Sequence, residues 1–389
     1  MLARLSRLVP SLLVLPFALP LAACGDNDVV ASPDAALSPD AAPSPDAAPA
    51  HAMAAAVSGD FNVTGVFSTL DVVTRVAQPN ALAAVAGGDP YLRRIGAELF
   101  VVNRDRGENI TIIGGAPLAL IDQYGTGGGS NPQDVAVAGG KLYVPALGSA
   151  GVLIINRTTR ALTTLAFPAI DPDGKPDCVS AFAVGTRVFV ACGVLDATFT
   201  PRGPGKIVVI NSASDTIEAT LDLPFANPIG LITPTSAGST LAGDVLIATA
   251  PSFTSVATGC LARVKTSGTP AVTGCVVTNA ALGAYVNRVQ MSADGQKLWL
   301  ATALYAPDFS SQSGTLRAYD LGRSALDAAI SPAAQQVLDV ATCPDGRVIA
   351  GDAKMGASGL RVYQGGVEET AAPISIGRPT GGGNGLACW

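Results

Sequence analysis

Six short segments of this 389-residue chain share one pattern, and their repetition restricts the fold more than any other feature. In each segment a turn with a glycine precedes a short run rich in Val, Leu, Ile or aromatic residues, which favour β-strands. The first apolar residues of the runs lie 43 to 57 residues apart: Leu99, Leu142, Val188, Val245, Leu298 and Val348. Periods of this size, with room for four strands in each unit, are typical of β-propeller blades. The pattern therefore predicts an all-β protein.

Each repeat continues into a hairpin, most clearly at residues 151–164 and 205–223. An alternating apolar strand there reaches a polar turn, at residues 156–159 or 211–215, and a second strand follows. These hairpins supply the third and fourth strands of their blades.

The two ends of the chain predict one further blade. Residues 65–78 match the hairpin at 151–164, residues 60–63 are the expected second strand, and residues 385–389 match the opening strand at 134–138. If both ends join one sheet, the ring closes and leaves no exposed sheet edge. We predict a seven-bladed β-propeller whose N- and C-terminal strands close the ring. Six blades with two loose ends is the alternative.

The repeat resembles the YVTN type of β-propeller repeat. Tyr143 and Val144 are followed by Gly148, Ser149 and the hairpin at 151–164, although Pro145 and Ala146 replace the Thr-Asn of that family. The resemblance extends over most of residues 60–389. It implies a propeller, and it implies a function only broadly, since the group includes binding scaffolds, surface proteins and lactonase-like enzymes.

The first 24 residues are typical of a secretory signal peptide, because Arg4 and Arg7 precede an apolar stretch interrupted by prolines. The stretch ends in small residues and Cys24, which resembles the bacterial lipobox, in which the cysteine is lipidated after cleavage. An ordinary signal peptide with an incidental cysteine is the alternative. Gly25 stands where an Asp often retains lipoproteins in the inner membrane, so the resemblance implies the outer membrane, at its periplasmic face or at the cell surface.

The segment after Cys24 is predicted to be a disordered spacer. Residues 26–56 contain Ser-Pro-Asp-Ala-Ala three times and few large apolar residues, so they lack the means to pack a core. The predicted organisation is therefore a signal peptide at 1–23, a lipidated cysteine with a tether at 24–56, and a propeller at 57–389.

Charge and histidine content exclude several classes of function. Five aspartates and no basic residue lie in residues 25–56, so they account for most of the net charge of −6, and the rest of the chain is nearly neutral. A nearly neutral domain without basic clusters argues against nucleic acid as a partner. The one histidine is His51, in the tether. The propeller therefore offers no His-ligated metal and no Ser-His or Cys-His catalytic pair.

Six cysteines remain besides Cys24, and an exported domain can keep them oxidised. Cys178 and Cys192 lie at equal distances from the turn at Gly185, and the turn at residues 267–268 lies midway between Cys260 and Cys275. Both pairs would face each other across antiparallel hairpins, within disulfide reach. Cys343 and Cys388 are then left to join the first strands of neighbouring blades. Buried free thiols are the alternative.

Residues 171–177 place Asp171, Asp173 and Asp177 in one tight turn. Calcium takes such oxygen ligands, but the match to a calcium loop is partial and lacks the terminal Glu. A solvated turn between blades is the favoured interpretation, with calcium as the alternative. No other cofactor is predicted.

Three neighbouring blades carry long loops between their second and third strands, at 193–205, 250–259 and 303–314. Loops on a rigid scaffold that carry aromatic and charged residues are a usual binding surface, although unconstrained surface variation is the alternative. The candidate rim residues are Phe199, Arg202, Phe253, Tyr305, Asp308 and Phe309.

Two functions are consistent with these features. The preferred one is a monomeric, non-enzymatic binding or scaffold module, held to the membrane by its lipid. Its partner would be an envelope protein, a glycan or a small molecule. The alternative is a lactonase-like hydrolase with carboxylates near the central channel. Carboxylates that converge at the channel mouth would favour the hydrolase, whereas an apolar mouth would argue against it.

Overall fold

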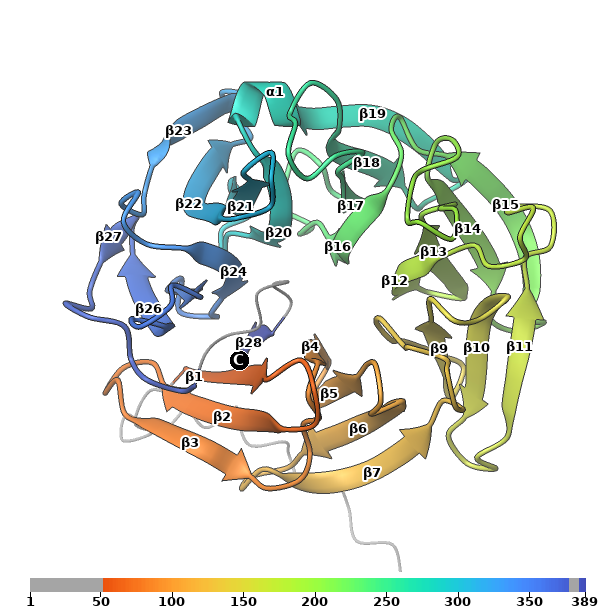
Figure 1. The fold of residues 1–389 in the computed structure, drawn as a ribbon, viewed down its shortest axis with the longest axis horizontal. Helices are drawn as coiled ribbons and strands as arrows, with labels where there is room; N and C mark the ends of the chain where they lie inside the picture. The colour runs from red at the N-terminus through yellow and green to blue at the C-terminus, as the bar shows by residue number, and fades with distance from the viewer. Residues whose placement is uncertain (1–51, 378–384) are drawn as a thin grey trace, which may run out of the picture. The chain divides into compact units, whose positions relative to one another are not determined.

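The computed structural model describes residues 52–377 and 385–389. They form seven four-stranded antiparallel sheets around a central axis, so the predicted seven-bladed propeller is confirmed (Figure 1). We number the blades in chain order, with the blade that contains both ends as blade 7. The signal peptide, the proposed lipidation site at Cys24 and most of the predicted tether lie outside the described residues.

In each blade the first strand lies nearest the axis and the fourth lies at the outside (Figure 1). Blades 1 to 3 consist of β4 (Pro90–Ile95), β5 (Glu98–Asn103), β6 (Asn109–Gly114) and β7 (Ala119–Gly125); β8 (Ala136–Ala138), β9 (Lys141–Pro145), β10 (Gly151–Asn156) and β11 (Leu162–Ala166); and β12 (Cys178–Val184), β13 (Arg187–Cys192), β14 (Lys206–Asn211) and β15 (Thr216–Asp222).

Blades 4 to 6 have the same arrangement. They consist of β16 (Pro228–Pro234), β17 (Asp244–Thr249), β18 (Cys260–Lys265) and β19 (Ala271–Thr278); β20 (Tyr285–Met291), β21 (Lys297–Tyr305), β22 (Gln312–Asp320) and β23 (Ala325–Ala329); and β24 (Val337–Thr342), β25 (Val348–Asp352), β26 (Gly359–Gln364) and β27 (Val367–Glu368). A single-turn helix, α1 (Asn279–Leu282), connects blades 4 and 5. No helix in the described part of the chain is long and apolar enough to cross a membrane.

Blade 7 joins the two ends of the chain, as predicted. Its order is β28 (Leu386–Cys388), β1 (Met53–Gly59), β2 (Gly65–Asp71) and β3 (Ala77–Leu82), and the pairing of β28 with β1 sets Ala54 opposite Cys388. The predicted second strand at 60–63 is wrong. The carboxylate of Asp60 accepts the backbone N–H groups of Asn62, Val63 and Thr64, which makes that segment a turn. The strand is β1, which begins four residues before the predicted domain boundary at 57.

The repeated sequence motif corresponds to the second strand of each blade and the turn before it. Adjacent blades cover the second strand on both faces, so it is buried along most of its length, as in β13 and β17. The turn before it needs a left-handed residue, which glycine adopts without steric cost. All six turn glycines have positive φ: Gly96, Gly140, Gly185, Gly243, Gly295 and Gly346.

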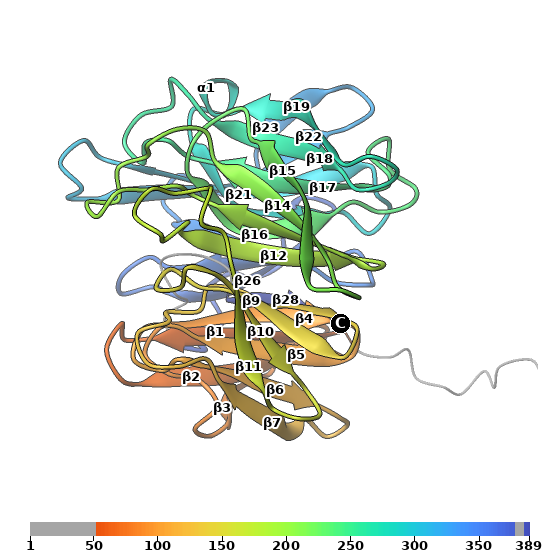
Figure 2. The ribbon, with the colours of Figure 1, turned by 90° about the vertical axis from the view of Figure 1, so that its right-hand side faces the viewer.

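Most of the hydrophobic core of the described residues lies between the blades, as seven layers. Each layer is a cluster of buried residues from two neighbouring sheets, for example Leu142 and Ile155 of blade 2 against Phe100 and Ile112 of blade 1. The layers continue around the ring, and the one between blades 6 and 7 contains Leu360 and Leu386. Figure 2 shows the sheets from the side, with loops at two opposite faces. The packed layers of the described residues therefore continue around the whole ring, and the strands nearest the two chain ends, β1 and β28, pair with each other.

The three predicted disulfides are present. Cys178 pairs with Cys192 directly across β12 and β13, and Cys343 joins Cys388 between blades 6 and 7. Cys260 and Cys275 are bonded but are not opposite each other, contrary to the expected register. Two register shifts interrupt the pairing of β18 with β19. Ala262 therefore lies opposite Cys275, and the disulfide runs diagonally between the two strands. Three disulfides in one domain indicate an oxidising compartment outside the cytoplasm.

Candidate functional site

The central channel has a hollow at each end. The starts of the inner strands line one hollow, and the ends of the same strands line the other. The first residues of these strands, such as Tyr91, Ile229 and Tyr285, line a cavity of about 500 Å³. The last residues, such as Arg94, Thr342 and Cys388, line a cavity of about 230 Å³. A single propeller axis therefore carries two chemically different hollows.

The larger hollow is lined by six aromatic side chains, and we call it the aromatic pocket: Tyr91, Phe199, Phe253, Tyr285, Tyr305 and Phe309. The Phe253 ring makes edge contacts with Tyr285 and Tyr305 at centroid distances of 5.3 and 6.4 Å, and Tyr305 continues to Phe309 at 5.5 Å. Its size is that of a small-molecule site. Among the described residues that line it, none is charged.

Two similar turns bring Phe199 and Phe309 to the rim of the aromatic pocket. The side chains of Asp196 and Asp308 each accept the backbone N–H two residues later, which tightens the loop tip. Both phenylalanines have left-handed backbones, with φ of 60° and 58°, and both side chains are mostly exposed. A non-glycine residue costs roughly 1–2 kcal/mol in that conformation. The two turns therefore hold large apolar groups in water at a cost to the fold.

Four amides provide the polar contacts of the aromatic pocket: Gln133, Asn227, Asn287 and Gln312. Gln312 Nε2 lies 3.4 Å from the Tyr285 hydroxyl, which accepts its hydrogen. Burial raises the pKa of both Tyr285 and Tyr305, so both remain neutral phenols that can donate hydrogen bonds. The pocket thus combines a broad apolar surface with a few neutral hydrogen-bonding groups.

Below the aromatic pocket, a buried ion pair connects blades 1 and 2. Arg93 Nε and Nη2 donate to the two carboxylate oxygens of Asp134 at 2.5 Å each, and both residues are buried. Ser180 Oγ of blade 3 donates to Asp134 Oδ2 at 2.6 Å and accepts the Ile232 N–H of blade 4 at 2.8 Å. One carboxylate therefore organises the inner strands of four blades.

Hydrogen bonds extend this network around the whole channel. Thr233 Oγ1 donates to the Val289 carbonyl of blade 5, and Asn287 Nδ2 donates to the Leu338 carbonyl of blade 6. The Gly385 N–H donates to Asp339 Oδ2, and Arg94 Nη1 returns to the Cys388 carbonyl. Every blade is thus linked to the next by at least one polar side chain. We call this network the polar ring.

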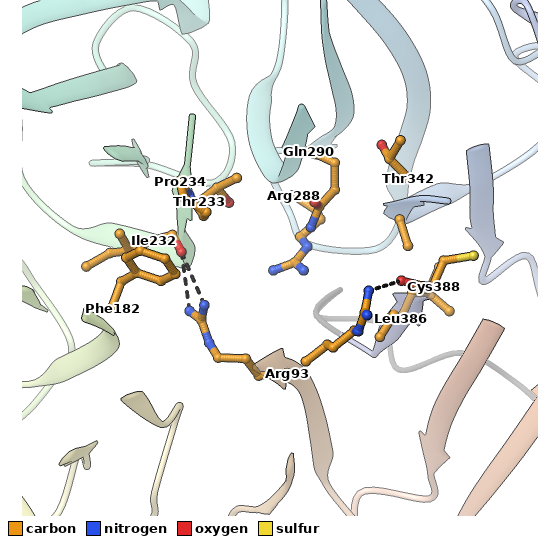
Figure 3. Close-up of a pocket in the computed structure, with 13 residues that line it drawn as sticks. Arg93, Phe182, Ile232, Thr233, Pro234, Arg288, Gln290, Thr342, Leu386 and Cys388 are labelled. Atoms are coloured by element: carbon orange, nitrogen blue, oxygen red, sulfur yellow. Dashed lines mark hydrogen bonds between the residues drawn. The ribbon is translucent and has the colours of Figure 1, made fainter. Parts of the chain in front are cut away.

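The smaller hollow lies beyond the polar ring, and we call it the arginine chamber because Arg93, Arg94 and Arg288 line it. Figure 3 shows Arg93 and Arg288 entering this space from different sides of the channel. Phe182, Thr233 and Gln290 complete much of its wall. The two mouths of the channel therefore differ in charge as well as in size.

The structure brings four of the six candidate rim residues into the aromatic pocket and separates the other two. Phe199, Phe253, Tyr305 and Phe309 line it. Arg202 instead binds the aspartates of the 171–177 turn, and Asp308 shapes its own loop by accepting hydrogen bonds from Ser310. Part of the predicted loop at 303–314 is also strand, since β21 and β22 remain paired as far as Tyr305 and Gln312.

The inner-strand residues Tyr91, Arg93, Arg94, Tyr285 and Arg288 were not among the predicted site residues. A signal for them exists, because Arg93 and Arg94 stand between Leu92 and Ile95 inside an inner strand. Once β4 is known to be an inner strand of a propeller, charged residues within it are expected to face the central channel.

An arginine from another loop, Arg202, binds the predicted calcium turn. Arg202 Nη1 lies 3.2 Å from Asp171 Oδ1 and 3.6 Å from Asp173 Oδ2, and the Asp177 carboxylate accepts the Leu195 N–H. Across residues 52–377 and 385–389, no group of three Asp, Glu, His or Cys residues is arranged to hold a metal ion. Asp171 and Asp173 therefore face the Arg202 guanidinium of the neighbouring loop.

Replacing Asp177 with Asn should stabilise the protein at neutral pH and have no such effect at pH 4. Burial raises the pKa of Asp177 to about 6 from 3.8, and the charges of Asp171 and Asp173 add to the rise. The folded state thus holds the proton more tightly, so ionisation lowers stability progressively between about pH 4 and pH 6. Asn keeps the acceptor for Leu195 and tolerates the φ of 50°. Urea unfolding should show a gain of about 1 kcal/mol at pH 7, after allowance for solvent screening. A difference that is the same at every pH would contradict this.

No protein-family model matches the chain, and neither does any curated protein. The chain is similar in structure to apo AztD from Citrobacter koseri, with a TM-score of 0.52 and 11% identity over 87% of this chain and 98% of that one. Virginiamycin B lyase from Staphylococcus aureus has a TM-score of 0.48 and 10% identity over 75% of this chain and 87% of that one. At these identities the likeness to AztD establishes a shared propeller fold alone.

Proposed function

We propose that this chain is an exported binding protein whose aromatic pocket takes a small, uncharged ligand that contains an aromatic or other flat apolar group. The aromatic pocket carries this proposal, because six aromatic rings surround a cavity of about 500 Å³ at the mouth of a rigid ring. Pockets of this kind use apolar walls for affinity and a few polar groups for orientation. In this pocket the aromatic rings form the apolar walls, and the neutral amides and phenols are the polar groups that would orient the ligand.

The two rim phenylalanines support binding more strongly than the buried aromatic residues do. Tyr285 is almost fully buried and also belongs to the core, so its presence has a structural explanation. Phe199 and Phe309 are 69% and 61% exposed, and their turns hold them in a strained conformation. Such residues contribute little to a core, whereas exposed aromatic side chains at a pocket rim are typical binding anchors.

The chemistry of the channel favours binding over hydrolysis. A hydrolase of the lactonase-like kind would need carboxylates free to act at a mouth of the channel. Asp134 is buried below the aromatic pocket and accepts hydrogen bonds from Arg93, Ser180 and Ala181, and the aromatic pocket itself is apolar. The observed lining thus supports ligand retention without chemical change.

The proposal includes the repeat type and the cellular position. On the residues at 143–164 we assign the repeat to the YVTN type. We further propose that Cys24 carries a lipid that holds the propeller at the outer membrane, with residues 25–52 as a spacer. The three disulfides are consistent with that oxidising environment.

The Cys24→Ser variant should move from the membrane fraction to the soluble fraction of the producing cell. The substitution removes the thiol that would receive the lipid and leaves the described propeller unchanged. Fractionation with labelled palmitate incorporation measures both effects together. Membrane association that persists in the variant would refute the anchor and leave the pocket proposal intact.

The double variant Phe199→Asn, Phe309→Asn should lose ligand binding without losing stability. A suitable probe is N-phenyl-1-naphthylamine, a neutral aromatic dye whose fluorescence rises in apolar surroundings. We expect at least about a tenfold loss of dye affinity, the size typical of an aromatic anchor. The melting temperature should stay the same or rise, because Asn tolerates the left-handed backbone that Phe adopts under strain.

Phe61→Asn is the matched control. Phe61 is also exposed, with φ of 57°, in the turn between β1 and β2, but it does not line the aromatic pocket. The Phe61→Asn variant should bind the dye with the same affinity as the unmodified protein. Equal affinity in all three proteins would overturn the assignment of the pocket, and so would an equal loss in the control. A panel of neutral aromatic compounds that displace the dye would then define the ligand class.

A further inference from the structure

The arginine chamber at the other end of the channel contains more positive than negative charge. Three guanidinium groups line it, from Arg93 and Arg94 of β4 and from Arg288 of β20. The carboxylates of the adjoining polar ring are Asp134 and Asp339. Among the described residues, the chamber and the ring next to it thus have one cationic group more than they have carboxylates.

Both carboxylates already accept hydrogen bonds from groups of the protein. Asp134 makes a two-pronged pair with Arg93 and also accepts the Ala181 N–H. Asp339 accepts the backbone N–H groups of Val340 and Gly385, while Arg288 Nε lies 3.7 Å from Asp339 Oδ1. The Arg288–Asp339 distance of 3.7 Å is longer than the 2.5 Å of the Arg93–Asp134 pair.

Arg94 has only backbone acceptors among its partners in the described structure. Its Nη1 donates to the Cys388 carbonyl at 3.0 Å, and its Nε donates to the Gly96 carbonyl at 3.1 Å. No ion pair within 4.0 Å joins Arg94 to a carboxylate of the residues described. These bonds hold the side chain at the chamber wall and leave its charge uncompensated by any side chain there.

The electrostatic environment of the chamber disfavours this accumulation of charge. Burial lowers the pKa of Arg288 to about 10, and the positive charge of Arg93 acts in the same direction against the attraction of Asp339. Burial also lowers the pKa of Arg94. A bound anion would compensate the excess charge, and guanidinium groups recognise oxyanions through paired hydrogen bonds.

We propose that the arginine chamber binds a small oxyanion, either inorganic phosphate or the carboxylates of a short dicarboxylic acid, with Arg94 and Arg288 as its principal donors. Figure 3 shows the Arg288 guanidinium pointing into the open space of the chamber. A volume of about 230 Å³ holds ions of this size but not a nucleotide. The site is separate from the aromatic pocket, because the polar ring lies between them, and it does not depend on the proposed function.

Isothermal titration of the full chain with inorganic phosphate and with succinate tests this proposal, with sodium chloride at matched ionic strength as the reference. We expect saturable binding of at least one oxyanion and none of chloride. Arg94→Gln should weaken that binding about tenfold, and Arg94→Lys should have an intermediate effect, because Lys keeps the charge but loses the paired donors. Comparing phosphate with succinate distinguishes the two sources of oxyanion.

Arg317→Gln is the matched control. Arg317 also donates to two backbone carbonyls, those of Leu282 and Asp327, but it lies on β22, outside the chamber. This variant should bind the oxyanion as tightly as the unmodified chain. A circular dichroism spectrum of Arg94→Gln that matches that of the unmodified chain would show that its fold is intact. Absence of saturable oxyanion binding would overturn the proposal, as would equal affinity in Arg94→Gln or an equal loss in Arg317→Gln.

Discussion

Removal of residues 385–389 should unfold the entire propeller at a much lower temperature, instead of loosening one blade. The deletion takes away the inner strand of blade 7, whose Leu386, Ala387 and Cys388 side chains are all buried. It also takes away the disulfide to Cys343 and the carbonyl that Arg94 binds. Because every blade packs on two neighbours, the loss of one inner strand exposes the layers on both sides. A thermal melt followed by circular dichroism should show one cooperative transition, with a melting temperature lowered by at least about ten degrees, since loss of the disulfide alone costs about 4 kcal/mol.

The double variant Cys343→Ser, Cys388→Ser separates the strand from the disulfide. It keeps β28 but removes the disulfide that closes a loop of 45 residues. The chain-entropy model gives such a disulfide a stabilisation of about 4 kcal/mol. We expect it to melt between the intact and the truncated proteins. Non-reducing peptide mapping of the intact chain should recover the two cysteines in one linked peptide. An unchanged melting temperature after truncation would show that the ends do not close the ring.

Breaking the Arg93–Asp134 pair from either side should cost about 3–5 kcal/mol, because each single change leaves a buried charge without its partner. Asp134→Leu would also remove the acceptor of the Ser180 hydroxyl and the Ala181 N–H. The double variant Arg93→Met, Asp134→Leu should cost less than the sum of the single variants, since it leaves no isolated charge. Urea unfolding of the unmodified chain, the two single variants and the double variant gives the coupling energy between Arg93 and Asp134.

The Lys206–Asp222 pair is the control for that cycle. Its nitrogen and oxygen also lie 2.5 Å apart, but the Asp222 side chain is 65% exposed. Asp222→Ala should therefore change the free energy of unfolding by less than about 1 kcal/mol. If the Arg93 and Asp134 variants were as mild as this control, the buried pair would not organise the inner strands.

The sequence predicted those parts of the fold in which each residue's environment repeats along the chain. Residues 188–192 lie in a second strand that both neighbouring blades cover, so they are uniformly apolar and the segment is recognisable in every repeat. The turn glycines are equally recognisable, because only their backbone conformation matters. Symmetry about the hairpin turn predicted both hairpin disulfides, but the register is shifted in each hairpin. A bulge between Cys178 and Ser180 brings Cys178 opposite Cys192, whereas two register shifts in blade 4 leave Cys260 and Cys275 diagonal to each other.

The missed features depend on contacts between distant segments. The alanines of β1 resemble the tether that precedes them, and they become a strand by pairing with β2 on one side and with β28, more than 300 residues later, on the other. The aromatic rim residues were predictable because long loops stand out in a regular repeat. Tyr91, Arg93, Arg94 and Arg288 were not predicted, because a charged or aromatic residue in an inner strand gains meaning only when the ring places that strand at the axis.

The pairing of β1 with β28 also determines when this protein can finish folding. During synthesis or export in chain order, β1 is among the first segments of the propeller to emerge, and its inner partner is the last. Until residues 386–388 arrive, blade 7 has an unpaired inner edge, and Cys343 has no partner thiol. Contacts so distant in sequence form slowly, and an unpaired strand edge invites association with other chains. The chain is therefore most vulnerable to aggregation and to mispaired disulfides just before residues 386–388 appear, when a chaperone or a thiol oxidase outside the cytoplasm would have its greatest effect.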